Sequence, residues 1–560
     1  MKIPDKAYFD FSGGIRRDKS PILLKDNEIQ SGKNFDIDEQ GRIVKRRGMQ
    51  AFGNITNNIF NMATFYDANQ AGTGYIGVYA ADTSNNVFIL APTNLTTAVT
   101  AGQTSSITSD EAIQNATSTF EMEGDIINYG GTSGGTTILT PSNVTSAHAV
   151  GAPIHQWQAG TGLTSTAIGV YFSTLNDNIL LNGSDVYNED TASDATFANA
   201  ATTPVVVFLT TYKTRVYGAG NGTSAGQTTR VFYSALNDGT TWTVASDYFD
   251  VEDSRNEPIT GLKSYNGNLI IYKPNSTHVY NLSSLRQVNS QVGAYNHFCP
   301  QEINGLIYTF CPSGIYITDG ESSKSIGEPV KEYWKNFIPT YSGTNNRIVT
   351  NCSAGRYKHL YLLYVGDVTL DDASTLSDVV LVYNTINKSW TVYDGFTDLI
   401  NFFPIDIYED NNSQIQLRSS LFFGSTSLGI FQVFENRTLD GASTLRGSDF
   451  TSDMFRDTGT PITMNLKTKP YDLGYPNYRK QFGYLKVFTE RPGVHLSYQI
   501  DGNDPKPLGL VNKKITRFQF PPDAKGYRCT ILIDESSTVA PVIYNGHIFE
   551  ECVALDKNVS

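Results

Sequence analysis

Short stretches of alternating apolar and polar residues recur along most of the chain. Residues 269–272 and 277–280 are two such stretches, separated by a turn that contains Pro and Asn, and residues 306–310 and 314–317 repeat the arrangement. Runs of this length that are rich in Val, Ile and Tyr and bounded by Gly, Pro or Asn predict β-strands joined by tight turns. The best helical candidate, residues 330–337, covers two turns at most. We therefore predict an all-β fold.

Between residues 56 and 440 these strands form a loose repeat. Strands at 360–365 and 380–384 are followed by a third at 390–393, in which a Trp is placed to pack against a neighbouring unit. This order is typical of one propeller blade. Repeats of roughly 40 to 50 residues, each with several strands, predict a β-propeller. The spacing is irregular, and we expect about six or seven blades.

Composition divides the chain into an N-terminal arm with a hairpin, a propeller with a Ser/Thr/Gly-rich insertion, a polar linker and a last group of strands. The insertion has too little apolar content for a core of its own, so we expect it either to order against a neighbouring subunit or to form a loose loop. About six antiparallel strands in roughly 100 residues predict a C-terminal β-sandwich. The predicted bounds are 1–55 for the arm, 56–440 for the propeller, 91–166 for the insertion, 441–462 for the linker and 463–560 for the sandwich.

The hairpin in residues 34–48 ends in the basic cluster Lys45, Arg46 and Arg47. Such a cluster is either a contact for a partner or, more commonly, a solvated face of a strand. Both interpretations place these three side chains at the surface.

Charge limits the classes of partner. The 560 residues include 42 Lys and Arg against 55 Asp and Glu, a formal net charge of −13. A nucleic-acid binder needs a basic surface, so we do not expect specific DNA binding, although an acidic wall could line a passage for DNA. The acidic balance also simply keeps a large protein in solution. The N-terminus lacks the apolar core of a signal peptide and no apolar run reaches 18 residues, so we expect synthesis in the cytoplasm and no membrane-spanning segment.

Templates for metal, cofactor and acyl-transfer chemistry are poorly matched. No CxxC, HExxH or P-loop is present, and the five Cys are an odd number without metal-like spacing. GxSxG occurs at 131–135 and 222–226, but neither copy has the strand before it and the helix after it that a nucleophile elbow requires. The cysteines are Cys299, Cys311, Cys352, Cys529 and Cys552.

Acid–base chemistry has no better candidate. The seven His are scattered, and carboxylate pairs such as Glu189–Asp190 and Asp371–Asp372 fall in predicted loops. Asp36 and the residues after it begin like a calcium loop, yet Arg47 stands where the bidentate Glu belongs. We therefore expect no catalytic, cofactor-binding or metal-binding residues, no cofactor and no enzymatic activity.

Residues 234–242 are similar to the Asp-box turn of sialidase-type propellers, with Gly239 and Trp242 matching and Asn237 in place of the Asp. This turn fixes the corner of a blade and has no catalytic role. It supports a propeller.

Four segments, in the order arm, interrupted propeller and terminal sandwich, resemble the tail hub, nozzle or "stabilisation" proteins of short-tailed double-stranded-DNA bacteriophages. They are the opening hairpin at 34–49, two blade motifs at 230–242 and 259–280, and a hairpin at 497–502. The insertion at 91–166 has no counterpart in the resemblance.

The resemblance implies a structural virion protein of the phage tail. Such a protein forms a ring, usually hexameric, below the portal and its adaptor. The ring extends the channel through which double-stranded DNA passes without specific binding, retains the genome before DNA ejection, and anchors tail fibres or receptor-binding proteins.

Two alternatives remain open. A glycan-binding tail protein with a lectin-like propeller predicts an exposed cluster of Tyr and Trp on one propeller face. A propeller glycan hydrolase predicts a pair of carboxylates with perturbed pKa values near the propeller axis.

Overall fold

The computed structural model describes residues 1–52, 57–67, 75–94 except 83 and 85, short segments between 98 and 199, 204–220, 227–342, 348–410, 415–434 except 427 and 428, 456–457, 460–535 and 542–557. Nearly all regular structure in this part of the chain is β-strand. The described helices are α1 (Lys331–Trp334) and the 3-10 turns η1 (Pro21–Leu23) and η2 (Glu328–Val330). The prediction of an all-β protein is confirmed.

Five four-stranded antiparallel sheets follow one another along the chain, each built from four consecutive strands. Within each sheet the strands form a simple meander, so each pairs with the strand before and after it. The first sheet consists of β16 (Phe172–Leu175), β17 (Asn178–Asn182), β18 (Val186–Glu189) and β19 (Ala198–Asn199), and the second of β20 (Phe208–Tyr212), β21 (Arg215–Ala219), β22 (Arg230–Tyr233) and β23 (Tyr248–Asp250). The third consists of β24 (Gly261–Tyr265), β25 (Asn268–Tyr272), β26 (Thr277–Tyr280) and β27 (Leu285–Asn289), and the fourth of β28 (Gln301–Ile303), β29 (Leu306–Cys311), β30 (Gly314–Thr318) and β31 (Ser323–Ser325). The fifth consists of β34 (Ser353–Tyr357), β35 (Leu360–Thr369), β36 (Thr375–Asn384) and β37 (Ser389–Tyr393).

Two six-stranded sheets flank these five in sequence. The earlier sheet has the order β12-β11-β15-β9-β8-β7, and the later sheet has the order β38-β39-β40-β6-β41-β42. Strand β6 comes from the start of the chain and pairs with β40, so the last sheet is completed by an N-terminal strand. The strands are β7 (Ile59–Asp67), β8 (Tyr75–Asp82), β9 (Val87–Asn94), β11 (Thr119–Met122), β12 (Asp125–Asn128) and β15 (Pro153–Ala159), and then β38 (Leu399–Asp410), β39 (Ile415–Ser425), β40 (Gly429–Val433), β6 (Met49–Ala51), β41 (Arg456–Asp457) and β42 (Thr460–Pro461).

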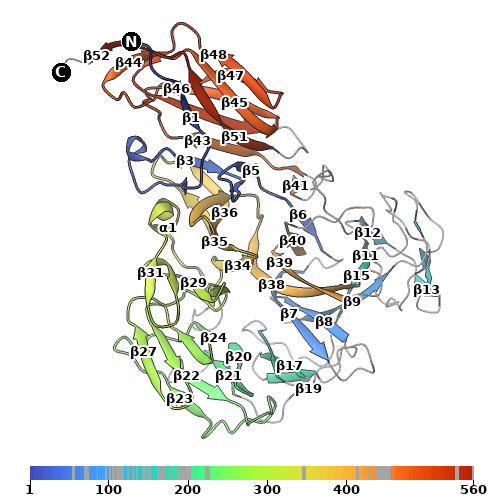
Figure 1. Cartoon of the computed structure of the whole chain (residues 1–560). Coiled ribbons are helices and arrows are strands. Elements are labelled where there is room, and N and C mark those ends of the chain that lie inside the picture. The colour runs from blue at the N-terminus through green and yellow to red at the C-terminus, as the bar shows by residue number, and fades with distance from the viewer. Residues whose placement is uncertain are drawn as a thin grey trace.

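The first strands of successive sheets lie against one another around a common centre. Strand β7 contacts β16 and β38, β20 contacts β16 and β24, and β34 contacts β28 and β38. Figure 1 shows the sheets arranged around this centre in the lower part of the molecule. The architecture is a β-propeller, as the sequence repeat predicted.

A buried tryptophan on β37 joins its sheet to the preceding one. Trp390 is 1% exposed, and its indole Nε1 donates a hydrogen bond to the Ile326 carbonyl just after β31, at 2.8 Å. The Trp strand of this unit therefore packs against the preceding sheet, as the sequence indicated.

The first 45 residues do not form a free arm. Strands β1, β4 and β5 join a sheet of order β4-β5-β51-β45-β48, in which β1 also pairs with β51. Strands β2 and β3 join a second sheet of order β2-β3-β43-β50-β46-β47. The strands are β1 (Lys6–Tyr8), β2 (Gly14–Ile15), β3 (Glu28–Lys33), β4 (Phe35–Ile37), β5 (Ile43–Lys45), β43 (Met464–Thr468), β45 (Tyr484–Arg491), β46 (Val494–Ile500), β47 (Lys506–Val511), β48 (Ile515–Gln519), β50 (Cys529–Glu535) and β51 (Ile543–Glu550).

These two sheets, here called the C-terminal module, share a buried cluster with side chains from both. Tyr498 on β46 and Phe549 on β51 each contact Phe520, at ring-centroid distances of 5.1 and 6.2 Å. A smaller sheet of β49 (Lys525–Gly526), β44 (Tyr478–Gln481) and β52 (Val553–Lys557) lies at the end where both chain termini are found (Figure 1). The N-terminal strands are thus structural parts of the C-terminal module.

Two predicted segments lie mainly outside the described residues. Residues 441–455 of the predicted linker are not described, and β41 and β42 in its remainder pair with each other beside β6. The described pieces of the predicted insertion include β15, which pairs along seven residues with β9, and the small sheet β10 (Ile107–Thr108), β14 (Thr137–Leu139) and β13 (Gly131–Ser133). Part of this polar segment therefore extends a propeller sheet.

Candidate functional site

Two places gather polar side chains inside the protein. One is the joint between the propeller and the C-terminal module, and the other is a cavity at the propeller axis.

Arg46 is the centre of the joint. Its side chain is 1% exposed although it is charged, and its guanidinium forms an ion pair with the Asp457 carboxylate. Nε donates to Asn34 Oδ1 at 2.8 Å, and the terminal nitrogens donate to the carbonyls of Asp394 and Arg47 at 2.7 and 3.0 Å. A buried charge is tolerated when it is paired and its donors are satisfied, and here both conditions hold. Arg46 therefore ties the arm to β41 and to the end of β37.

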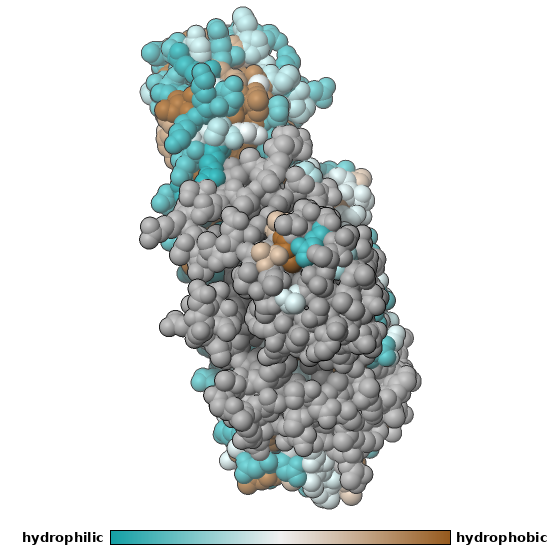
Figure 2. Space-filling model, turned by 90° about the vertical axis from the view of Figure 1, so that its right-hand side faces the viewer, coloured by the Kyte–Doolittle hydropathy of each residue, from teal (hydrophilic) through white to brown (hydrophobic). Residues whose placement is uncertain are grey.

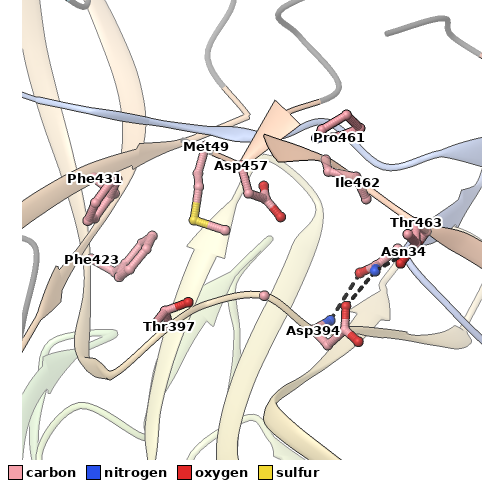
Figure 3. Close-up of a pocket in the computed structure, with 11 residues that line it drawn as sticks. Asn34, Met49, Asp394, Thr397, Phe423, Phe431, Asp457, Pro461, Ile462 and Thr463 are labelled. Atoms are coloured by element: carbon pink, nitrogen blue, oxygen red, sulfur yellow. Dashed lines mark hydrogen bonds between the residues drawn. The ribbon is translucent and has the colours of Figure 1, made fainter. Parts of the chain in front are cut away.

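Asn34, which accepts a hydrogen bond from Arg46, forms further hydrogen bonds at the joint. It takes a left-handed backbone (φ 61°), which Asn tolerates better than most residues, and its amide nitrogen donates to Asp394 Oδ1 at 2.5 Å and to the Thr463 carbonyl at 2.8 Å. Figure 3 shows these bonds beside a pocket of about 340 Å³. Met49, Phe423 and Phe431 form the apolar wall of the pocket.

Two further buried pairs lie at the joint or beside it: Tyr393–Asp36 joins β37 to β4 across the joint, and Lys45–Glu535 joins the two sheets of the C-terminal module. Lys45 Nζ is ion-paired with the Glu535 carboxylate, with both side chains at most 2% exposed. Tyr393 donates its hydroxyl to Asp36 Oδ1, and burial raises the pKa of Asp36 to about 6 against the opposing effects of that bond and of Arg46. Lys45 and Arg46 are therefore internal, and the expectation that the basic cluster forms a solvated face or an external contact is wrong for these two residues. The reason is that β50 and β41 place carboxylates opposite them.

The axial cavity has a volume of about 440 Å³ and lies among the first strands of the propeller sheets. Its wall combines apolar side chains with several hydroxyl groups. The residues that line it are Asn61, Met62, Ala63 and Thr64 on β7; Phe172, Ser173 and Thr174 on β16; Leu209, Thr210 and Thr211 on β20; Leu262, Lys263 and Ser264 on β24; His297, Phe298, Pro300 and Gln301; and Phe402, Phe403 and Pro404 on β38.

Lys263 and His297 are the ionisable groups in that described wall. Desolvation lowers the pKa of Lys263 to about 8, with Glu302 opposing the shift and Arg356 adding to it. Desolvation, aided by the Lys263 charge, lowers the pKa of His297 to about 3. His297 Nδ1 accepts a hydrogen bond from the Leu262 backbone N–H at 3.3 Å. His297 is thus neutral at pH 7, and no carboxylate belongs to the described wall.

A third cavity of about 630 Å³ lies beside α1. Its wall includes four carboxylates, Glu332 on α1, Asp367 on β35, Asp378 on β36 and Asp398 just before β38. It also includes Ile338, which is 78% exposed. Burial raises the pKa of Asp378, and the charges of Asp367 and Asp398 add to the effect. This groove is an acidic surface with an apolar edge.

The chemical motifs considered from sequence are not assembled into a site. The second GxSxG and residues 134–135 of the first lie outside the described residues. Asp371 pairs with Lys335, and Asp372 lies 3.9 Å from Arg17, so this carboxylate pair serves surface ion pairs. The five Cys are free and buried. Among the described residues, no group of three or more His, Cys, Asp or Glu is arranged to hold a metal ion.

The Asp-box-like turn joins β22 to β23. Trp242 is 5% exposed and donates its Nε1 hydrogen to the Gly239 carbonyl at 2.8 Å, and Asn237 takes the left-handed conformation (φ 58°). Asp238, one position after Asn237, accepts hydrogen bonds from the Thr240 N–H and hydroxyl at 2.8 and 2.7 Å. The turn is therefore a structural corner whose carboxylate has moved by one residue.

Comparisons with known proteins extend only to the fold. No family model matches the chain, and no curated protein sequence matches it. Among solved structures, YCF48 bound to D1 peptide is 7% identical with a TM-score of 0.36, covering 70% of this chain and 96% of that one. BamB from Moraxella catarrhalis is 10% identical with a TM-score of 0.33, covering 69% and 98%. The WD40 domain of Neurospora crassa Pan2 is 8% identical with a TM-score of 0.29, covering 62% and 90%.

Sequence reasoning missed both polar sites. The joint depends on pairs such as Arg46–Asp457, which are 411 residues apart and have no local signal. The axial Lys263 lies in an ordinary alternating strand, Gly261–Tyr265, and only the position of β24 at the centre of the propeller gives it significance. No helix in the described part of the chain has the length and hydropathy needed to cross a bilayer.

Proposed function

We propose that this chain is a structural subunit of the tail of a short-tailed bacteriophage, and that it assembles as a ring, hexameric in the usual case, below the portal and adaptor. The ring extends the DNA channel, retains the packaged genome and anchors fibres or receptor-binding proteins. In this proposal the protein is not an enzyme, is made in the host cytoplasm and functions in the virion. Double-stranded DNA passes it without specific contacts.

The observation that carries the proposal is the joint. The start of the chain builds strands into both sheets of the C-terminal module and then completes the last propeller sheet with β6. The buried ion pair of Arg46 with Asp457 connects the two parts, and the Lys45–Glu535 pair stabilises the C-terminal module beside it. A ring subunit that holds pressurised DNA has to transmit load between its parts. A joint held by strands from both ends of the chain and by a buried ion pair suits that task better than a flexible linker does.

The proposal includes the finer architecture. The propeller has seven blades, one for each of the first strands β7, β16, β20, β24, β28, β34 and β38, with β6 closing the seventh. The two sheets of the C-terminal module form a β-sandwich, in which the N-terminal strands count as sandwich strands.

Charge distribution supports assembly with further copies of the chain. Residues 463–560 hold 13 of the 42 basic and 10 of the 55 acidic residues, so residues 1–462 hold 29 and 45. The C-terminal segment is thus net basic while the rest of the chain is strongly acidic. Complementary charge steers association between unlike surfaces, and a head-to-tail contact between unlike surfaces closes into a ring when the rotation allows.

Edge strands of the C-terminal module are the proposed basic contact. Strand β48 has Ile515, which is 55% exposed, and Leu510 on β47 is 46% exposed, with Lys513 and Lys514 between them. Figure 2 shows hydrophobic residues exposed among hydrophilic ones on the described upper part of one face. We assign the acidic groove beside α1, with its exposed Ile338, as the complementary surface on a neighbouring copy.

The two alternatives have less support among the described residues. A lectin-like face needs exposed aromatic residues, but Tyr341 is the one Tyr, and no Trp appears, among the exposed large hydrophobic residues of the described surface. A hydrolase needs two carboxylates at the axis, and the described wall of the axial cavity has Lys263 and His297 instead.

Native mass spectrometry with negative-stain imaging tests the proposal, on the purified chain alone and mixed with its portal–adaptor complex. We expect a ring, either in isolation or on the adaptor. A monomer that does not bind the adaptor would reject the proposal, and binding in a glycan array would then favour the lectin alternative.

A further inference from the structure

Lys263 is half-buried in the wall of the axial cavity, and it differs from the buried lysines of the described residues in having no partner. Lys45 pairs with Glu535, Lys273 lies 3.0 Å from Asp253 and 2.7 Å from the Val251 carbonyl, and Lys480 donates to two carbonyls. Among the described residues, no carboxylate or carbonyl accepts a hydrogen bond from Lys263. The charge of Glu302 acts to raise the pKa of Lys263, but the two side chains do not form an ion pair. Partial removal from water disfavours the charged form of an ammonium unless an anion lies close to it.

The surroundings of Lys263 supply further donors. Thr64, Thr210 and Ser264, from three adjacent regions of the cavity wall, have hydroxyls that form no hydrogen bond with the described residues. Thr211, by contrast, donates to the Thr174 carbonyl at 2.5 Å and contacts Ser173 at 2.7 Å. One ammonium and three available hydroxyls, without an opposing carboxylate in the wall, form a site that favours an acceptor-rich, negatively charged group.

Aromatic and apolar side chains complete the cavity. Phe298 stacks on Tyr171 at a ring-centroid distance of 5.4 Å and meets Phe403 edge-on at 6.5 Å, so packed aromatic rings support this part of the wall. His297, stacked on Phe208 at 5.5 Å, is held in place by its bond from Leu262. A volume of about 440 Å³ falls in the range of small-molecule sites, which combine apolar walls with a few polar anchors.

We propose that the axial cavity binds a small organic molecule through its oxyanion, a carboxylate or a phosphate, with Lys263 as the counter-ion and the hydroxyls of Thr64, Thr210 and Ser264 as further donors. This site is separate from ring assembly, so it stands or fails independently of the proposed tail role.

Amine-reactive labelling at pH 8, read by peptide mass spectrometry, tests the site in the full-length protein. A lysine with a pKa of about 8 is half unprotonated at that pH, compared with under one per cent for a lysine at about 10.4. We expect Lys263 to be labelled at least several-fold faster than the exposed Lys324. Inorganic phosphate or acetate, added at constant ionic strength, should slow labelling of Lys263 several-fold and leave Lys324 unchanged. Protection by phosphate alone or by acetate alone identifies the preferred oxyanion.

Binding itself provides the second measurement. Titration of phosphate and acetate, followed by NMR of methyl-labelled protein, should give saturable shifts that weaken as pH rises through 8, because Lys263 then loses its proton. Lys263→Met should abolish these shifts and Lys324→Met should retain them, with circular dichroism confirming that both variants are folded. Equal labelling of Lys263 with and without both anions, or identical titrations for Lys263→Met and wild type, would overturn the proposal.

Discussion

Replacing Arg46 with Met removes the charge at the centre of the joint while keeping a side chain of similar length. The change leaves the Asp457 carboxylate, whose side chain is 17% exposed, without its counter-ion. It also removes the guanidinium donor to the Asp394 carbonyl, and Asn34 Oδ1 keeps only its bond from the Asp394 N–H. It also removes a guanidinium that lies 5.5 and 5.4 Å from the ring centroids of Tyr393 and Phe396.

Breaking a buried ion pair from one side typically costs about 3 to 5 kcal/mol. Because Asp457 retains some contact with solvent, we expect the lower end, a loss of about 3 kcal/mol in the free energy of unfolding at pH 7. Arg46→Met/Asp457→Asn should recover part of this loss, since the double variant no longer has a buried unpaired charge.

The pH dependence gives a more specific signature. Burial raises the pKa of Asp457, and Arg46 opposes that shift, so removing Arg46 raises the pKa further. A carboxyl group whose pKa is higher in the folded than in the unfolded state favours folding at low pH, and that contribution is lost as pH rises through the folded value. The deficit of Arg46→Met should therefore shrink as pH falls from 7 toward about 4.

Urea denaturation and differential scanning calorimetry across this pH range measure the effect. Arg286→Met is the matched control, because Arg286 forms its ion pair with Glu321 at an exposed site. The unfolding midpoint of this variant should equal that of the wild-type protein. A shift for Arg46→Met no larger than that of the control, or a deficit that does not change with pH, would refute the account of the joint.

Three further changes test other parts of the structure. Asp36→Asn should stabilise the protein at pH 7 by about 1 to 3 kcal/mol and have no effect near pH 4, because the pKa of Asp36 is about 6 in the folded state and near 4 in the unfolded state. Calorimetry at both pH values measures the two effects, and equal effects would contradict this account. Trp242→Phe should lower the unfolding free energy by about 1 to 3 kcal/mol through loss of the bond to Gly239, and an unchanged urea midpoint would show that the Asp-box-like turn does not hold its blade. Lys513→Glu/Lys514→Glu should prevent assembly seen by native mass without altering circular dichroism, whereas rings of normal size would exclude this edge as the contact.

The sequence predicted the fold where the signals are local. Alternation in segments such as 269–272 and 277–280 gave the strands, and a repeat of such pairs gave the propeller. The path of the first 45 residues could not be predicted, because strands such as β5 pair with β51, about 500 positions later, through backbone bonds that leave no local pattern. The polar composition of residues 91–166 predicted a segment without a core of its own, and it did not show that β15 in this segment pairs with β9 of a propeller sheet.

The candidate sites show the same division. The Asp-box-like turn was found because its residues are close in sequence, although Asp238, which makes the hydrogen bonds, was not the position expected to do so. The basic cluster was recognised but placed at the surface, because sequence does not show that Glu535 and Asp457 lie opposite it. Lys263 attracted no attention, since an unpaired lysine is recognisable only after its surroundings are known.

The oligomeric state of the chain tests the central claim most directly. Native mass spectrometry and negative-stain images should be recorded for the wild-type protein alone and with the portal–adaptor complex, at near-physiological ionic strength. The tail-ring account predicts closed rings of one defined copy number, six in the usual case, either free or formed on the adaptor. A protein that remains monomeric at micromolar concentration and does not bind the adaptor would contradict it.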